Sequence, residues 1–319
     1  MISFTSCSSS ETSPRGPVSR TAGDRYYRFT YETKIPVPDG AKQVSVWVPL
    51  PLEDPGVQSV YDLQHHVTGG VATITREGTH GNRMLHVRGS GAAKTIDIRW
   101  TANILRAKDT GQGTLPNRAV YLQGTSLVPI DGEAARLADR LGTRNALAST
   151  EMRARLIYSD VLDSMAYDKS GEGWGRGDFH HSVTVCRGNC TDFHARFIGV
   201  ARASTIPTRF TMGIPLKPTP KGAYNSYHCW AHWYDQGTWK PVDISEADKV
   251  AETDPAKAAS FFGTLDPDRL SLSFGRDVNL EPRQATGPLN YFVFPHAEAD
   301  GAKIPLTKDN WNFGWENLP

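Results

Sequence analysis

Several features that would assign this chain to a large class of proteins are missing from its sequence. No apolar stretch approaches the roughly twenty residues that a membrane-spanning helix needs. The formal net charge is +1, and no long basic run gives an electrostatic footprint for nucleic acid or an anionic membrane. The chain also has no internal repeat, no phosphate-binding glycine loop and no heptad run. These absences predict no nucleic-acid partner and no transmembrane segment, and they leave the oligomeric state open.

The N-terminal residues lack the signals that direct a chain across a membrane. They have neither the basic region nor the apolar region of a signal peptide, and Cys7 is not preceded by an apolar, lipoprotein-type segment. The chain is therefore cytoplasmic, or it begins after a signal that has been removed, and its localisation stays open. Residues 1–24 are rich in Ser, Thr, Gly and Pro without apolar periodicity, so we predict a disordered tail there.

A β-rich domain is predicted for residues 25–128. Apolar and polar residues alternate in this region, as they do in strands with one buried face, and Gly and Pro mark the turns. The alternating runs cover residues 27–33, 44–49, 84–87 and 95–102. Short strands joined in this way favour a β-sandwich of about a hundred residues. Its own function is not evident from the sequence.

Helical periodicity begins only after Pro129, and residues 129–319 are predicted to form a second domain. Amphipathic spacing runs over 133–141 and 152–165, and further strands are expected at 270–274 and 291–294. A chain of 319 residues also exceeds what one core usually serves. The predicted fold class is therefore α+β, with a helix-and-sheet domain preceded by a β-sandwich-like N-terminal domain.

Cys190 carries the strongest functional signal in the chain. It lies in the segment RGNCTDFH, residues 187–194, where a glycine turn leads into an expected helix with Phe193 and Phe197 on its apolar stripe. Unpaired N–H groups and the positive end of the helix dipole lower the pKa of a thiol at a helix start, and the thiolate is the attacking species. Cys190 is therefore a candidate nucleophile.

A histidine and an aspartate follow on two predicted strands. Residues 227–233, YHCWAHW, and residues 237–243, GTWKPVD, are separated by a tight turn. In the hairpin that these strands would form, Asp243 lies a residue or two past the position opposite His232, within side-chain reach of His228. A Cys–His pair makes a thiolate near neutral pH, and an Asp fixes the tautomer of the His. The order of these residues is that of a thiol triad.

This region resembles the transglutaminase-like superfamily, whose core has a Cys at a helix start, then Gly-Ile-Pro-x-Arg, His-x-Trp and Gly-x-Trp-x-Pro-x-Asp. The matching segments here are TIPTR at 205–209, HCW at 228–230 and WKPVD at 239–243. One residue of the pattern is altered, because Thr205 stands in place of the usual Gly.

The resemblance reaches beyond this core to bacterial members of the superfamily. Those members have Trp-Gly-Arg-Gly-Asp before the Cys, and Ser-Phe-Gly-Arg-Asp and Leu-Asn-Tyr-Phe after it. The corresponding residues here are 174–178, 273–277 and 289–292. The resemblance covers about residues 130 to 300, with a weaker likeness in the N-terminal part.

The resemblance implies a papain-like catalytic domain in which Cys190 is the nucleophile, His228 is the base and acid, and Asp243 orients the imidazole. It implies acyl transfer through a thioester on a peptide, protein or small amide substrate, with hydrolysis and transamidation both open. No cofactor and no metal are expected. The N–H of Cys190 is one natural oxyanion donor. Trp174 and Trp230 are candidates for a substrate or oxyanion contact.

Three positions near this trio have a less defined role. Position 184, where papain-like enzymes place a Gln, is Thr184, so the second oxyanion donor is not identified. His232 stands where many superfamily members have an acidic residue, and we expect it to alter the pocket more than the trio. Asp192, the other carboxylate near the thiol, is expected to interact only with the helix dipole.

Other interpretations of the same residues stay open. A zinc site could draw on the thiols and imidazoles of this region, although adjacent strand residues point to opposite faces: Cys186, Cys190, His194, His228, Cys229 and His232. A disulfide between Cys186 and Cys190 would remove the nucleophile in an oxidising compartment. A non-catalytic binding or scaffolding module could keep the fold, but it would be expected to lose a member of the trio. Asp243 also fits a helix cap, and the tryptophans also fit core packing.

Overall fold

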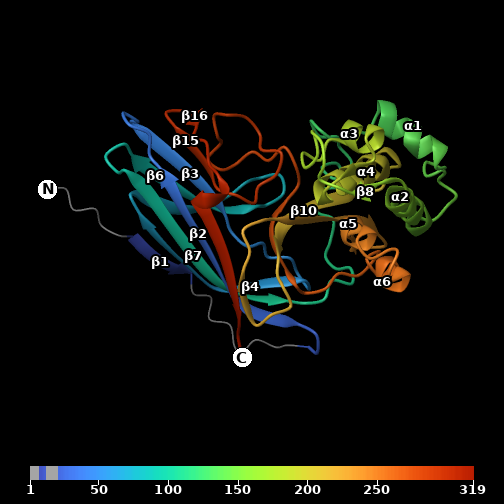
Figure 1. Ribbon diagram of the computed structural model, residues 1–319, viewed down its shortest axis with the longest axis horizontal. Helices are drawn as coiled ribbons and strands as arrows, with labels where there is room; N and C mark the ends of the chain where they lie inside the picture. Colours follow the sequence, from blue (N-terminus) through green and yellow to red (C-terminus); the bar gives the residue numbers. More distant parts are fainter. Residues whose placement is uncertain (1–6, 12–20) are drawn as a thin grey trace.

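The computed structural model describes residues 7–11 and 21–319, and it confirms the predicted α+β class. A β-sandwich lies beside a unit in which helices pack against a four-stranded sheet (Figure 1). The predicted disordered tail, residues 1–24, falls largely outside the described residues, but Cys7–Glu11 form the edge strand β1. Among the described residues, no helix is both long and apolar enough to cross a bilayer.

The sandwich consists of a six-stranded and a five-stranded antiparallel sheet. The first has the order β1-β4-β7-β2-β17-β11, with β4 at Gln58–Thr68, β7 at Thr95–Arg106, β2 at Arg25–Pro36, β17 at Trp311–Asn317 and β11 at Lys221–Ala223. The second has the order β16-β15-β3-β6-β5, with β16 at Ala302–Lys303, β15 at His296–Ala299, β3 at Gln43–Pro49, β6 at Arg83–Ser90 and β5 at Gly70–Arg76. Strand β2 places Tyr27, Phe29 and Tyr31 in the core and leaves the residues between them more exposed, as the alternating sequence predicts.

The predicted boundary, with residues 129–319 as a separate domain, is wrong for the C-terminal end of the chain. Strand β17 pairs along its length with β2, so that Phe313 lies opposite Tyr31, and β15 pairs with β3. Figure 1 shows the red C-terminal strand next to the blue and teal strands of the sandwich. The alternation of apolar and polar residues indicates that a segment is a strand, but it does not indicate which strand pairs with it almost three hundred residues away.

The second unit is built around helix α4, Cys190–Ala203. Five shorter or flanking helices belong to it: α1 Gly132–Arg140, α2 Thr150–Ser164, α3 Phe179–Thr184, α5 Ile244–Asp248 and α6 Pro255–Ser260. Its sheet has the order β13-β12-β10-β14, with β13 at Thr238–Val242, β12 at His228–Asp235, β10 at Thr208–Pro215 and β14 at Arg269–Phe274. A two-residue parallel pair, β8 Ala166–Tyr167 and β9 Arg187–Gly188, precedes α4, and a short 3₁₀ helix, η1 Lys308–Asn310, precedes β17.

The expected helices and strands of this unit are found with one exception. Helices α1 and α2 and strand β14 lie within a residue or two of the predicted ranges. The expected strand at 291–294 is wrong, because that segment pairs with no strand. Its aromatic residues pack instead, and the ring of Phe294 stacks on Trp311 with centroids 4.4 Å apart. The aromatic residues of this segment therefore indicate side-chain packing and not a strand.

The hairpin of β12 and β13 has the register that brings His228 and Asp243 together. Gln236 and Gly237 have φ values of 47° and 86°, the left-handed conformation that a two-residue turn with the twist of a hairpin requires. The turn pairs Asp235 with Thr238 and, further along, His232 with Pro241. Asp243 follows β13 directly, at the place where the strand gives way to α5.

Candidate active site

The residues around Cys190 fix the start of helix α4. The side chain of Asn189 caps the helix by accepting a hydrogen bond from the N–H of Thr191 at 2.9 Å, and the N–H of Asn189 donates to Asp192 Oδ2 at 2.9 Å. A Cβ at Gly188 would lie 2.3 Å from Asp192 Oδ2, so a side chain at that position would displace the cap. The Gly-Asn-Cys-Thr-Asp sequence thus places the Cys190 thiol on the first residue of a capped helix.

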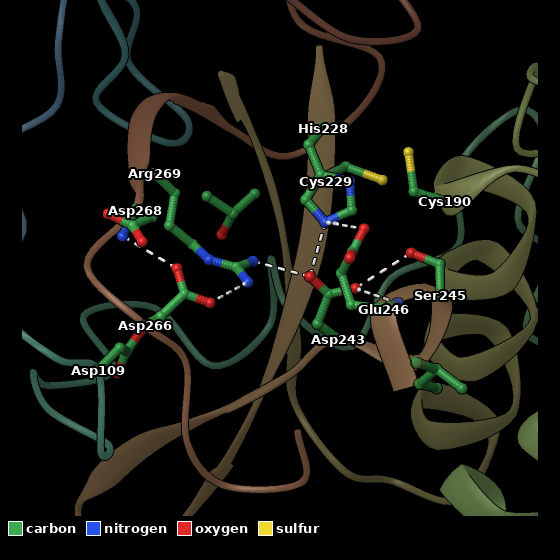
Figure 2. A network of polar contacts seen from close by, with 12 residues as sticks. Asp109, Cys190, His228, Cys229, Asp243, Ser245, Glu246, Asp266, Asp268 and Arg269 are labelled. Carbon is green, nitrogen blue, oxygen red and sulfur yellow. Dashed lines mark hydrogen bonds and ion pairs between the residues drawn. The ribbon is translucent and has the colours of Figure 1, made fainter. Parts of the chain in front are cut away.

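Asp243 holds the imidazole of His228 and caps a helix at the same time. His228 Nε2 donates to Asp243 Oδ2 at 2.6 Å, and Arg269 Nη1 donates to the same oxygen at 2.7 Å (Figure 2). The other oxygen, Oδ1, accepts from the Ser245 hydroxyl at 3.1 Å and from the N–H of Glu246 at 3.2 Å. The helix cap and the histidine contact are both present, and each uses a different carboxylate oxygen.

This network sets the charges of Asp243 and His228. Burial opposes the ionised carboxylate, but the adjacent His228 and Arg269 hold the pKa of Asp243 far below its usual range. Burial also opposes the imidazolium, yet the charge of Asp243 and its hydrogen bond raise the pKa of His228 to about 10. His228 is therefore protonated at neutral pH. Because Nε2 is engaged by Asp243, Nδ1 is the ring nitrogen left for the Cys190 side.

The Cys190 thiol has a neighbour that sequence reasoning overlooked. The Cys229 thiol donates a hydrogen bond to it and, with the hydrogen bond and charge of His228, lowers the pKa of Cys190 well below its usual value despite burial. Figure 2 shows the two sulfur atoms next to each other. Burial, and then the contact with Cys190, raise the pKa of Cys229. These shifts favour the thiolate form of Cys190 and the neutral thiol of Cys229.

His194 connects the start of α4 to the segment that carries Asp243. Its Nδ1–H donates to the carbonyl of Cys190 at 2.7 Å, and its Nε2 accepts from the N–H of Ile244 at 3.3 Å. These two contacts define the neutral tautomer, and burial lowers the pKa of His194 in agreement with it. The His at position 194 is thus a buried structural group, and the sequence had indicated it only as a metal-ligand candidate.

A cleft of about 420 Å³ opens on the Cys190 thiol. Aromatic and cationic side chains dominate its walls, and Glu246 is the one carboxylate that lines it. The lining residues are Tyr167, Lys169, Trp174, Asn189, Cys190, Pro215, Leu216, Lys217, Tyr224, Ser226, Tyr227, His228, Glu246 and Lys249. We call this the Cys190 cleft.

The other candidate residues are divided between the cleft and the interior. Trp174 lines the Cys190 cleft. Trp230 is fully buried, with its ring centroid 6.1 Å from that of His228, so its position favours core packing over a substrate contact. His232 does not line the cleft, because it is buried and 2.8 Å from Asp109 Oδ2. The expectation that His232 shapes the pocket is wrong. Thr184 is exposed on α3, away from the cleft lining, and donates to a backbone carbonyl.

Asp192 has a larger role than the predicted interaction with a helix dipole. Besides the N–H of Asn189, its carboxylate accepts hydrogen bonds from the N–H groups of Gly175 at 2.7 Å and Gly177 at 2.9 Å. Both glycines have positive φ, which bends the loop so that its N–H groups point at one carboxylate. Asp192 therefore fixes the loop that presents Trp174 to the cleft.

The two motifs downstream of the trio hold the same loop from its other side. Arg276 donates to the carbonyls of Gly177 at 2.7 Å and Arg176 at 2.8 Å. The amide of Asn290 donates to the carbonyl of Arg176 at 2.8 Å and accepts from Arg276 Nε at 3.0 Å. Three segments that are separate in the sequence, 174–178, 273–277 and 289–292, thus form one hydrogen-bonded layer beside the Cys190 cleft.

The rival sites predicted from the cysteines and histidines are not assembled. Within residues 7–11 and 21–319, no group of three or more His, Cys, Asp or Glu side chains could hold a metal ion. Cys186 and Cys190 are both free thiols, and Cys186 donates to the carbonyl of Val183 at 3.2 Å. The arrangement places an imidazole and a carboxylate in contact at 2.6 Å beside the Cys190 thiol.

Comparisons with known proteins agree with this architecture. The family model of the transglutaminase-like superfamily matches residues 135–244. A protein of Haemophilus influenzae, described as an uncharacterized protein, is 27% identical over 323 residues, which cover 86% of this chain and 86% of that protein. The crystal structure of a putative cysteine protease from Cytophaga hutchinsonii shares the fold with a TM-score of 0.56 and 13% identity, over 98% of this chain and 100% of that one. The structural likeness therefore includes both units.

Proposed function

We propose that the chain, whose residues 135–244 match the family model of the transglutaminase-like superfamily, is a cysteine hydrolase that cleaves an amide or peptide bond through a thioester on Cys190. The observation that carries this proposal is the buried contact between His228 and Asp243 at 2.6 Å, beside a thiol whose pKa is lowered at a helix start. The description of the structural neighbour from Cytophaga hutchinsonii as a putative cysteine protease points the same way.

Acylation begins when the Cys190 thiolate attacks the substrate carbonyl carbon. The N–H of Cys190, at the positive end of α4, is placed to stabilise the oxyanion, and the Trp174 indole in the cleft is the proposed second donor. The imidazolium of His228 then gives its proton to the leaving nitrogen as the C–N bond breaks. An amine and a thioester on Cys190 result, and Asp243 keeps the imidazole in the productive orientation.

Deacylation uses the same residues in reverse. Neutral His228 takes a proton from water, the resulting oxygen nucleophile attacks the thioester carbonyl, and the C–S bond breaks to release a carboxylic acid. The thiolate and imidazolium are then restored. Water is the proposed acceptor because Lys169 and Lys217 line the cleft and repel a protonated amine, which a transamidation reaction would have to bring to the thioester.

The proposal is tested by trapping the thioester. A pool of fluorogenic peptide amides is offered to the wild type, Cys190→Ala and Cys186→Ala, and intact-mass spectrometry follows acylation while fluorescence follows turnover. Cys186 is a matched control because it is also a free thiol close to the helix start. We expect turnover and an acyl adduct in the wild type and Cys186→Ala, and neither in Cys190→Ala. Incorporation of an added amine at the expense of hydrolysis would instead favour transamidation.

A second test examines the thiolate without a substrate. Site-resolved labelling with iodoacetamide measures the reactivity of each thiol against pH. We expect Cys190 to react quickly below pH 8, because its pKa is lowered, and Cys229 to react slowly, because burial raises its pKa. A Cys190 that reacts no faster than an ordinary thiol with a pKa of about 8.5 would favour the non-catalytic scaffolding module.

A further inference from the structure

The Cys190 cleft carries more positive than negative side chains. Three lysines line it, Lys169, Lys217 and Lys249, against the single carboxylate of Glu246. Lys249 Nζ lies 2.5 Å from Glu246 Oε1, so this pair neutralises itself. Among the residues that the structure describes, neither Lys169 nor Lys217 has a carboxylate partner in an ion pair. Their charges are therefore available to a ligand in the cleft.

The charges beneath the cleft do not offset this excess. The thiolate of Cys190 is matched by the imidazolium of His228, and the carboxylate of Asp243 is matched by Arg269 Nη1 at 2.7 Å. Arg269 also donates to Asp266 at 3.1 Å, but Asp266 does not line the cleft. Among the described residues that line the cleft, Lys169 and Lys217 are therefore the lysines without a carboxylate partner.

Lys169 and Lys217 are attached to different and well-anchored segments. The Lys169 ammonium lies 5.4 Å from the ring centroid of Tyr167 and 5.9 Å from that of Trp174, so the two aromatic side chains hold it at the cleft wall. Lys217 follows the lining residues Pro215 and Leu216 at the end of β10. Its carbonyl accepts a hydrogen bond from Arg25 Nη1 of the sandwich at 2.9 Å.

We propose that the Cys190 cleft selects an anionic acyl donor, namely a peptide with an acidic side chain next to the scissile carbonyl. Lys169 and Lys217 bind the carboxylate, and the rings of Tyr167 and Trp174 cover the apolar part of the same segment. This inference rests on the proposed hydrolase activity for its substrate, but the charge selection itself can be measured without turnover. Opposite charges increase both the affinity and the rate of encounter, and salt weakens both.

The first test compares two alkylating agents of nearly the same size at Cys190. Iodoacetate carries the carboxylate that the cleft is proposed to bind, and iodoacetamide is neutral. We expect the ratio of their rates to fall by about threefold for each of Lys169→Glu and Lys217→Glu, the size of a partly exposed ion pair. The matched control is Lys303→Glu, an exposed lysine on β16 in the sandwich, and it should leave the ratio unchanged.

Added salt should lower the same ratio in the wild type, because the Debye length is about 10 Å at 0.1 M. Lys169→Gln and Lys217→Gln provide a second pair of variants if charge reversal disturbs folding, and thermal unfolding is recorded for all of them. A ratio that is the same in the wild type and in every cleft variant would overturn the anionic-donor inference, whatever the activity of the protein.

The second test uses three peptide amides that differ only in the residue beside the scissile bond, which is Glu, Gln or Lys. We expect kcat/KM to fall in that order, and the preference for Glu over Lys to reverse in Lys169→Glu combined with Lys217→Glu. Cleavage without such a preference would overturn the inference and leave the hydrolase proposal standing. A lysine-dependent iodoacetate ratio with no cleavage of any peptide would support the anionic cleft and contradict the hydrolase proposal.

Discussion

The sandwich and the surroundings of Cys190 bury opposite kinds of side chain. In the sandwich, Tyr31 and Trp100 stack with centroids 5.3 Å apart, and Phe29 packs on the same indole at 5.6 Å. Beside Cys190, the buried groups are the charged side chains of Asp243, Arg269 and His228. Apolar burial stabilises a fold by about 25 cal/mol per Å². Burial of charge costs several kcal/mol per ion, which partners only partly offset.

Stability and chemistry therefore depend on different parts of this molecule. The sandwich supplies apolar area, and its edge receives β11 from the second unit, so that the wall of the cleft is attached to a stable framework. In the proposed mechanism, the mutually paired charges of the Cys190 network hold a thiolate and an imidazolium for reaction. Substitutions in the sandwich should therefore change the free energy of unfolding, and substitutions in the network should change the chemistry.

The largest expected effect is on turnover in Asp243→Asn. The amide cannot stabilise the imidazolium of His228 or enforce its tautomer, so we expect kcat to fall by about 10⁴, as in the Ser-His-Asp template. Arg269 retains its contact with Asp266 at 3.1 Å, which limits the loss of stability. Steady-state kinetics and thermal unfolding are measured together.

Asp192→Asn is the comparison variant, because Asp192 is the other buried carboxylate near the thiol and lies in the first turn of α4. Its carboxylate accepts from the N–H groups of Gly175 and Gly177, so its loss should loosen the Trp174 loop, lower stability and raise KM. If Asp192→Asn lowers kcat more than Asp243→Asn at equal stability, Asp243 is not the residue that orients the imidazole.

The second largest effect is expected on the free energy of unfolding in Phe29→Ala, a substitution in the sandwich. This side chain is fully buried against Trp100, so we expect a loss of about 3–5 kcal/mol in the free energy of unfolding. Below the unfolding transition, the iodoacetamide labelling rate of Cys190 should match that of the wild type. Denaturant unfolding and site-resolved labelling test the two halves of this statement. A slowed labelling rate in the folded variant would show that the sandwich also controls the chemistry.

The pH dependence of stability provides a smaller effect, which comes from the network alone. The pKa of His228 is raised to about 10, so its stabilising charge is fully present below the unfolded value of about 6.5 and is lost as pH rises through 10. The lowered pKa of Cys190 has the opposite slope up to the unfolded value of about 8.5, so it offsets the His228 slope only below that pH.

Above about pH 8.5 this offset ends, and His228 alone should lower stability by about 2 kcal/mol up to pH 10. The buried Cys229 adds to the fall, because its raised pKa keeps a proton that the unfolded chain loses. Urea unfolding at a series of pH values measures it. In Asp243→Asn the raised pKa of His228 is lost, so the alkaline fall should shrink to the part that comes from Cys229. An unchanged alkaline fall in that variant would show that His228 does not contribute to it.

The same contrast explains what the sequence could and could not predict. The place of Cys190 at a helix start and the contact of His228 with Asp243 could be predicted, because a helix cap, a strand and a tight turn are local patterns. Arg269 and Cys229 were not recognised as partners of the trio, because their contacts depend on how β14 and β12 pack beside α4. The C-terminal strand β17 was assigned to the wrong unit for the same reason, since its partner β2 is distant in the sequence.

The smallest expected effect lies at the far end of α4 from Cys190. Thr205, which replaces the usual Gly of the superfamily pattern, follows the helix with a φ of 61°. Its N–H bonds to the carbonyl of Arg202, and the N–H of Ile206 bonds to the carbonyl of Ala201, which together are the helix-ending motif that favours glycine. A β-branched residue is strained in this conformation. Thr205→Gly should relieve that strain and raise the free energy of unfolding by about 1 kcal/mol.

Thr205→Ala is the matched control for this change, because it removes the branch but keeps the Cβ. The Thr205 side chain is exposed, so neither substitution should remove much packing. Because the left-handed conformation disfavours any Cβ, alanine should recover less stability than glycine. Denaturant unfolding ranks the three proteins, and the Cys190 labelling rate should be the same in all of them. If Thr205→Gly is less stable than the wild type, the conformational entropy that glycine adds to the unfolded chain outweighs the strain energy relieved in the folded state. The backbone conformation of Thr205 would then not reduce the stability of the protein appreciably.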